Sequence, residues 1–75
     1  MKLEFLVPDS SVAAVIGKQG QNVRRINEDN AIVMSVEGRI DKFEYRVVKM
    51  EGEKEGIMKG ITEVLKVVHE MQGRV

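Results

Sequence analysis

The stretch from Val15 to Ile26, which reads VIGKQGQNVRRI, contains the feature that most restricts the fold of this chain. Gly17 and Gly20 lie three positions apart, and apolar residues precede the first and follow the second. Glycine readily adopts the left-handed backbone conformation that helix ends often require. The pattern therefore predicts that a short apolar helix over 12–16 ends at Gly17 and that a second helix begins at or just after Gly20.

The rest of the chain supplies three strands and a long helix. Residues Lys2–Val7 alternate apolar and polar side chains, and Pro8 ends this strand because it has no N–H for a strand ladder. We expect Asp9 or Ser10 to cap the first helix and Asn30 to take the left-handed turn after the second. Two further strands and a final helix are predicted over 32–36, 43–50 and 53–72.

An apolar stripe at helical spacing predicts which face of the final helix is buried. Its members are Ile57, Ile61, Val64, Leu65, Val68 and Met71. Gly56 and Gly60 interrupt the same helix, and each costs it about 1 kcal/mol relative to alanine. Because such a cost calls for a compensating gain, we expect another part of the chain to pack closely against Gly60.

Size and composition exclude several classes of protein. The 75 residues predict a single domain over 1–75 with one small core. With no cysteine and only one histidine, His69, we expect no disulfide, no metal site and no cofactor. The glycine loop lacks the signature of a nucleotide-binding P-loop, and no pair of residues is spaced for catalysis, so an enzyme is not expected. Without a long apolar run, the chain is expected to be intracellular, in the cytoplasm or nucleus.

Charge is distributed unevenly along a chain that is neutral overall. Twelve basic residues balance twelve acidic ones, yet the window 10–27 contains Lys18, Arg24 and Arg25 and no acidic residue. The N-terminus of a helix attracts anions through its unpaired N–H groups and its partial positive charge. Adjacent helical residues diverge by about 100°, so we expect only Arg24 to face the loop side. The loop can thus be interpreted as a cradle for a phosphodiester, or as a plain helix connector with a surface lysine.

The chain resembles KH domains over nearly its whole length. The family pattern V-P-x-x-x-V-x-x-I/V-I-G-K-x-G-x-x-I/V-x-x-I is matched by Val7, Pro8, Val12, Val15, Ile16, Gly17, Lys18, Gly20, Val23 and Ile26. The strand R-V-V-x-I-x-G, which leads into the last helix of the family, is similar to residues 46–52. The segment FLVPDSSVAAVIGKQG is most like the poly(C)-binding, hnRNP K and Nova branch.

This resemblance implies an α+β fold class. The expected architecture is the type I, eukaryotic-style KH fold, β-α-α-β-β-α, with a three-stranded antiparallel sheet and three helices packed on one face. It also implies a narrow groove beside the GKQG loop that holds about four nucleotides of single-stranded RNA or DNA, with RNA favoured.

Matching positions identify the residues of the expected site. Together with Arg24 from the charge pattern, they are Ala13, Ile16, Gly17, Lys18, Gln19, Gly20, Val23, Met34 and Arg46. The resemblance implies that Ile16, Val23 and Met34 form an apolar floor and that residues 17–20 hold the nucleic-acid backbone. Arg46 matches an arginine that reaches a base in poly(C)-binding members.

Three positions depart from the family pattern. Ala13 replaces a usual glycine, so one base is expected to sit less closely. Met34 replaces a usual isoleucine or leucine and gives a softer floor. Asn30 and Ala31 replace a frequent Thr-Gly before the second strand. None of these changes touches the loop.

The leading functional hypothesis is a single-stranded nucleic-acid-binding module, one part of a larger post-transcriptional regulator. Its expected partners are RNA or DNA and further KH or other RNA-binding modules in the parent chain, with no membrane. The alternative is a KH fold with a silent groove that serves protein–protein association. The intact glycine–lysine loop argues against this alternative, since a silent groove has no need of Lys18.

Overall fold

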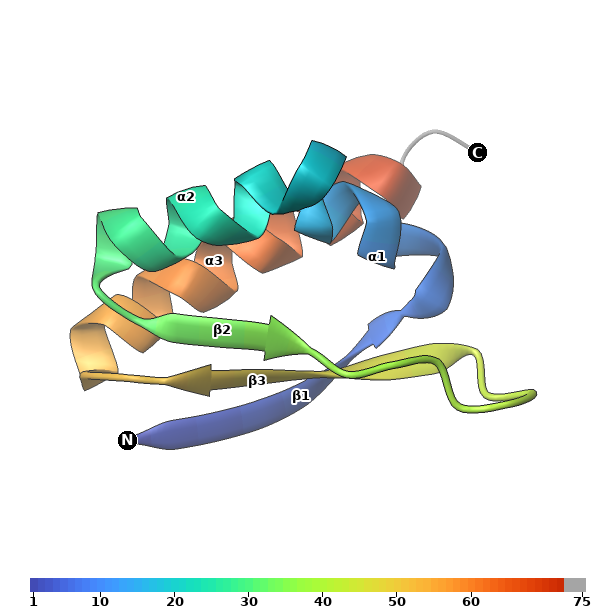
Figure 1. The fold of residues 1–75 in the computed structure, drawn as a ribbon, viewed down its shortest axis with the longest axis horizontal. Helices are drawn as coiled ribbons and strands as arrows, with labels where there is room; N and C mark the ends of the chain where they lie inside the picture. Colours follow the sequence, from blue (N-terminus) through green and yellow to red (C-terminus); the bar gives the residue numbers. More distant parts are fainter. Residues whose placement is uncertain (73–75) are drawn as a thin grey trace.

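A computed structural model describes residues 1–72 and shows an α+β fold with three helices on one face of a three-stranded sheet (Figure 1). The elements are β1 (Lys2–Pro8), α1 (Asp9–Ile16), a 3-10 turn η1 (Lys18–Gly20), α2 (Gln21–Asn30), β2 (Val33–Val36), β3 (Tyr45–Glu51) and α3 (Lys54–Gln72). The predicted order of elements is therefore confirmed. The prediction of one domain over 1–75 includes residues 73–75, which lie outside the described residues.

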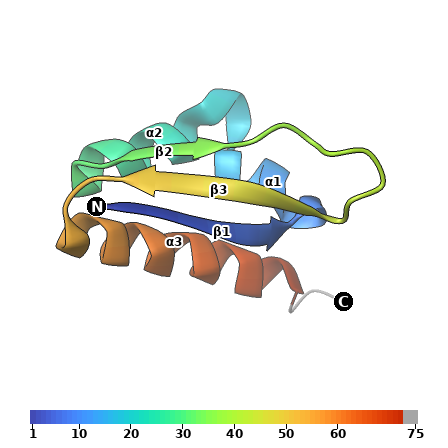
Figure 2. The ribbon, with the colours of Figure 1, turned by 90° about the horizontal axis from the view of Figure 1, so that it is seen from below.

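The strands lie in the order β1-β3-β2, and both pairings are antiparallel (Figure 2). Phe5 on β1 lies opposite Val48 on β3, and Met50 on β3 lies opposite Met34 on β2. Side chains alternate between the two faces of a strand, so Met34, Val48 and Met50 face the helices together. All three are buried, at 3% exposure or less. The loop between β2 and β3 extends beyond the end of the sheet (Figure 1).

The core lies between the sheet and the helices and takes residues from every strand and every α-helix. Its buried members are Val7, Val12, Val15, Ile26, Ile32, Met34, Val48, Met50, Ile57, Val64 and Val68. Within residues 1–72, no helix is both long enough and apolar enough to cross a bilayer.

Two of the predicted helix ends are wrong. The first helix starts at Asp9 directly after Pro8, and no side chain caps it. Its backbone is held instead by the N–H of Asp9, which donates to the carbonyl of Glu44 at 2.7 Å. The left-handed residue after α2 is Ala31, with φ 52°, and not Asn30. Asn30 remains helical and donates its side-chain amide to the carbonyl of Ile26.

The strand limits differ slightly from the expected ones. The predicted 32–36 strand begins at Val33, and the predicted 43–50 strand covers Tyr45–Glu51. Phe43 belongs to a turn, because its N–H donates to the carbonyl of Ile40 at 3.0 Å. The local turn thus removes two residues from the start of the expected strand.

The stripe predicted for α3 is only partly buried. Ile57, Val64 and Val68 are in the core, whereas Leu65 is 54% exposed and Met71 is 39% exposed. Leu65 follows Val64 directly, so the helix turns it about 100° away from the residue that faces the core. The face in contact with the sheet is therefore narrower than the apolar pattern indicated.

The expected close packing at Gly60 is confirmed. A Cβ atom there would lie 2.7 Å from Cδ1 of Ile32, and a Cβ atom at Gly56 would collide with the carbonyl oxygen of Asn30. Both glycines thus let α3 approach the segment between α2 and β2. The close packing of this segment against α3 offsets the cost in helix propensity of the two glycines.

Candidate nucleic-acid interface

The GKQG loop contains three residues with positive φ. Gly17 has φ 78°, Gln19 has φ 55° and Gly20 has φ 77°. At Gly17 a Cβ atom would lie 2.7 Å from Cβ of Asn22, so α2 approaches closely enough to exclude any side chain. At Gly20 nothing lies within 4 Å of the position that a Cβ atom would take, so only the backbone conformation favours glycine there. The space beside Gly20 is therefore open to a ligand.

The left-handed conformation of Gln19 was not expected from the sequence. A residue with a side chain in this region costs about 1 kcal/mol or more. Lys18 and Gln19 are both exposed at the tip between the two helices. The loop thus holds two polar side chains in solvent on a strained backbone, outside the core.

A groove lies beside the loop. It is lined by Ile16, Gly20, Val23, Arg24, Asn27 and Val36. These residues come from the end of α1, the last residue of η1, the first two turns of α2 and the end of β2. The apolar members are half-buried, and Arg24 is exposed at the edge. The groove therefore combines an apolar surface with a positive charge.

Four of the predicted site residues line this groove: Ile16, Gly20, Val23 and Arg24. Sequence reasoning missed Asn27 and Val36. Asn27 lies four residues after Val23, which places both on the same face of a helix. Val36 is the third member of the alternating set that begins at Ile32. Both signals were present in the pattern, but assigning them required knowledge of how α2 lies against β2.

Met34, predicted as part of the groove floor, is not among the residues that line this groove. It is 3% exposed and belongs to the core. Its backbone N–H donates to Oδ1 of Asn27 at 2.8 Å, which joins β2 to α2. Val36, two residues further along the same face of the strand, lies where the groove opens. On β2, Val36 therefore lines this groove, while Met34 lies beneath it in the core and stays a predicted site residue.

Ala13 and Arg46 are not among the residues that line the groove. Ala13 is exposed on α1, one turn before Ile16. Arg46 donates from Nε to the carbonyl of Glu37 at 2.9 Å, and its Nη1 lies 3.9 Å from Asp9. Its side chain is only 20% exposed. Because Glu37 directly follows the groove residue of β2, Arg46 is held next to the groove.

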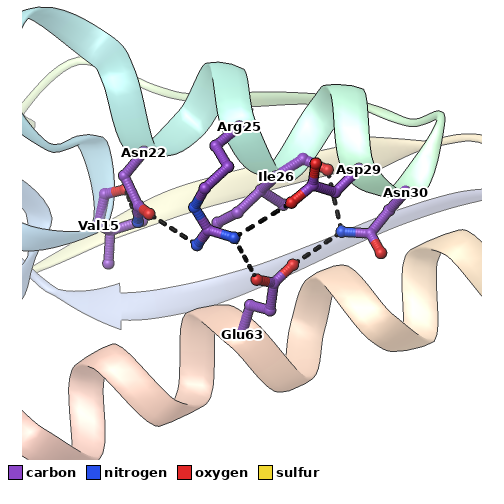
Figure 3. A network of polar contacts seen from close by, with 7 residues as sticks. All are labelled: Val15, Asn22, Arg25, Ile26, Asp29, Asn30 and Glu63. Atoms are coloured by element: carbon purple, nitrogen blue, oxygen red, sulfur yellow. Dashed lines mark hydrogen bonds and ion pairs between the residues drawn. The ribbon is translucent and has the colours of Figure 1, made fainter.

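The two adjacent arginines of α2 point to different sides, as expected. Arg24 lines the groove, and its Nη2 is 3.4 Å from the carbonyl of Gln19. Arg25 lies toward α3, where its Nη1 is 2.7 Å from Oε1 of Glu63 (Figure 3). The hydrogen bonds from Arg25 and Asn30 hold the pKa of Glu63 below its ordinary value, and Glu63 in turn raises the pKa of Arg25.

The opposite end of α2 is acidic. A hollow between Asn30 and the start of α3 is lined by Asp29, Glu51, Glu53 and Glu55, with Lys59 as its one basic side chain and the N-terminal residue Met1 at its edge. Within residues 1–72, no three acidic or histidine side chains gather closely enough to hold a metal ion. The groove and this acidic hollow thus give the two ends of α2 opposite charge.

Comparison with known proteins decides the family. A family model described as KH domain matches residues 2–66. The chain belongs to the KH domain family. Members of this family are generally modules that bind single-stranded nucleic acid.

Solved structures of vigilin domains resemble this KH domain. The first type I KH domain of human vigilin is 26% identical, with a TM-score of 0.76, and the match covers 100% of this chain and 80% of that one. Repeat 6 of vigilin is 24% identical, with a TM-score of 0.67 and coverage of 91% and 93%. The fourteenth type I KH domain of human vigilin is 21% identical, with a TM-score of 0.68 and coverage of 99% and 79%. The type I fold of this KH domain is thereby confirmed. No curated protein matches the chain.

Proposed function

We propose that this KH domain binds single-stranded nucleic acid in the groove beside the GKQG loop. The observation that carries the proposal is the open space at Gly20, with an exposed lysine on one side and a half-buried apolar surface on the other. A phosphodiester can approach the loop backbone there while Lys18 and Arg24 neutralise its charge. Bases then lie against Ile16, Val23 and Val36.

The proposed ligand is about four nucleotides long, and RNA is favoured over DNA. Pyrimidine-rich oligonucleotides are the first ligands to test, because Arg46 matches an arginine that reaches a base in the poly(C)-binding members that the chain resembles, and the base preference itself stays open. So small a site implies an affinity near micromolar, or about −8 kcal/mol. We therefore place this module in a longer intracellular regulator of mRNA, where neighbouring modules raise the effective concentration.

Protein–protein association with a silent groove is the competing function. It would leave the loop as a connector between helices. Lys18 and Gln19 lie outside the core and are exposed, so they can be changed with little effect on folding. The two functions can thus be separated by substitution at the loop tip alone.

The test is the double variant Lys18→Asp/Gln19→Asp, measured against short RNA and DNA oligonucleotides of pyrimidine-rich sequence by fluorescence anisotropy. Two carboxylates would repel the phosphate that the loop is proposed to hold, so we expect most of the affinity to be lost. Circular dichroism should be unchanged, because surface substitutions alter stability by about 0.5 kcal/mol or less. Equal affinity of the folded variant and the wild type would reject the loop as the binding element.

A further inference from the structure

Asn22, in the first turn of α2, holds the GKQG loop from behind. Its Nδ2 donates to the carbonyl of Val15 at 2.8 Å, close to the end of α1. Its Cβ and backbone N occupy the space that a side chain on Gly17 would need, at 2.7 Å and 2.8 Å. Asn22 therefore contacts both the helix that enters the loop and the first glycine of the loop. Its position sets how closely α1 and α2 meet.

Asn22 is itself held by a chain of polar contacts that reaches α3 (Figure 3). Nη2 of Arg25 donates to Oδ1 of Asn22 at 2.9 Å, while Nη1 of Arg25 donates to Oε1 of Glu63 at 2.7 Å. The other carboxylate oxygen of Glu63 accepts from Nδ2 of Asn30 at 2.8 Å. Glu63 on α3 thus contacts the middle of α2 at Arg25 and its C-terminal end at Asn30, and it reaches Asn22 in the first turn through Arg25.

The chemistry of these groups allows only one arrangement. A guanidinium has donors and no acceptor, and a side-chain amide has one acceptor oxygen and one donor nitrogen. The side-chain oxygen of Asn22 therefore points toward Arg25. Its side-chain amide nitrogen then points the other way, toward the carbonyl of Val15. The carboxylate of Glu63 keeps the guanidinium in this orientation, because each of its oxygens accepts one hydrogen bond.

We propose that Arg25 and Glu63 are positioning residues for nucleic-acid binding, which they influence through Asn22 and the loop without lining the groove. The proposal rests on the function proposed above. It assigns a binding role to two residues that are 38 positions apart in the chain and that meet where α2 faces α3 (Figure 3).

For one substitution, simple electrostatics and the positioning role predict opposite changes in the affinity for nucleic acid. Glu63→Gln removes a negative charge, and charge alone would strengthen the attraction for phosphates. The glutamine, however, replaces one carboxylate oxygen by an amide N–H₂ that cannot accept, so it cannot offer Arg25 and Asn30 the two separate oxygens that they contact in the wild type. If Glu63 positions the loop, the variant must bind more weakly despite its more favourable net charge.

The experiment compares wild type, Glu63→Gln and the control Glu55→Gln, which makes the same change in charge at an exposed site on the same helix. The probe is the short pyrimidine-rich RNA oligonucleotide, at a temperature where thermal melting shows every variant to be folded. We expect Glu63→Gln to bind about three- to tenfold more weakly, the usual range for a coupled residue outside a site. The control should bind as well as wild type or slightly better. Equal or tighter binding by folded Glu63→Gln would overturn the proposal.

Amide resonances provide a readout that does not depend on the ligand. We expect the backbone amide signals of Gly17 and Gly20 to shift in Glu63→Gln and to stay in place in Glu55→Gln. Unchanged loop signals in Glu63→Gln would overturn the positioning role. If wild type binds none of the oligonucleotides, the proposed function fails, and the loop signals alone then decide whether Glu63 sets the loop geometry.

Discussion

Met34 and Val36 lie two residues apart on one face of β2, yet they have different roles. Met34 is in the core and is 3% exposed, whereas Val36 is half-buried and lines the groove. Alternation along a strand identifies residues that share a face, but it does not show where the covering helices end. Two positions along the strand therefore separate a residue that is buried in the core from one that lines the groove.

Val36→Ser should weaken nucleic-acid binding, because it removes apolar surface from the groove. Val33→Ser is the matched control, since Val33 lies on the same strand, is 67% exposed and points to the other face. Val36→Ser removes two methyl groups, each worth about 0.8 kcal/mol when fully buried, and since Val36 is only half-buried we expect about half of the sum, or about a fourfold loss. Val33→Ser should bind like wild type in the same anisotropy titration. Equal losses for the two variants would show that strand propensity, and not the groove, is responsible.

At the scale of the elements, the sequence predicts the order of strands and helices but not all of their ends. The period of apolar residues and the two loop glycines are local signals, and they identify every strand and every α-helix, although not the turn η1. The start of α1 depends instead on Asp9, whose N–H is paired with Glu44 across 35 positions of the chain. The same holds for the site. Its loop could be predicted from adjacent residues, whereas Asn27 and the Arg25–Glu63 pair required the packing of α2 against β2 and α3.

The contact between α2 and α3 should depend on pH. The hydrogen bond from Arg25 is the main cause that lowers the pKa of Glu63 below its ordinary value of 4.5, with Asn30 and Lys66 contributing. A lowered pKa in the folded state means that the stabilisation is complete above the ordinary value and is lost as the pH falls through the lowered one. Asp29, which also contacts Arg25 at 3.4 Å, competes for the same guanidinium.

Thermal melting of wild type and Glu63→Gln at several pH values tests this dependence. Because the pair is partly exposed and screened, we expect Glu63→Gln to be less stable by about 0.5 kcal/mol near neutral pH. This difference should shrink toward zero as the pH is lowered below 4, where the wild-type carboxyl becomes protonated. A difference that is the same at pH 7 and pH 3 would contradict the assignment of this stabilisation to the ionised pair.

At the scale of the whole molecule, the net charge is zero but the charged residues are unevenly distributed. Twelve basic and twelve acidic residues cancel, but Arg24 lines the groove, Lys18 is exposed on the adjoining loop, and the carboxylates of the acidic hollow lie at the far end of α2. Arg25 and Arg46 are near carboxylates, at 2.7 Å from Glu63 and 3.9 Å from Asp9. Few cations are therefore placed to neutralise phosphates.

The salt dependence of binding should consequently be shallow. With two phosphates neutralised on a single strand, the slope of log K against log salt should be about −1.4, at roughly 0.7 for each phosphate. Titrations of the RNA oligonucleotide at several salt concentrations measure this slope directly. A slope steeper than about −4 would require a larger basic surface than the groove provides.

The opposite charges at the two ends of α2 also determine how the molecule meets a polyanion. A particle without net charge is not drawn as a whole toward a distant strand, but its electric dipole experiences a torque in the field of that strand. The torque turns the loop end forward and the acidic end away before any contact forms. Encounters that begin at the acidic hollow are repelled by its carboxylates, so a larger share of collisions arrives with the proposed binding groove in front. Such orientation weakens as added salt shortens the range of the field.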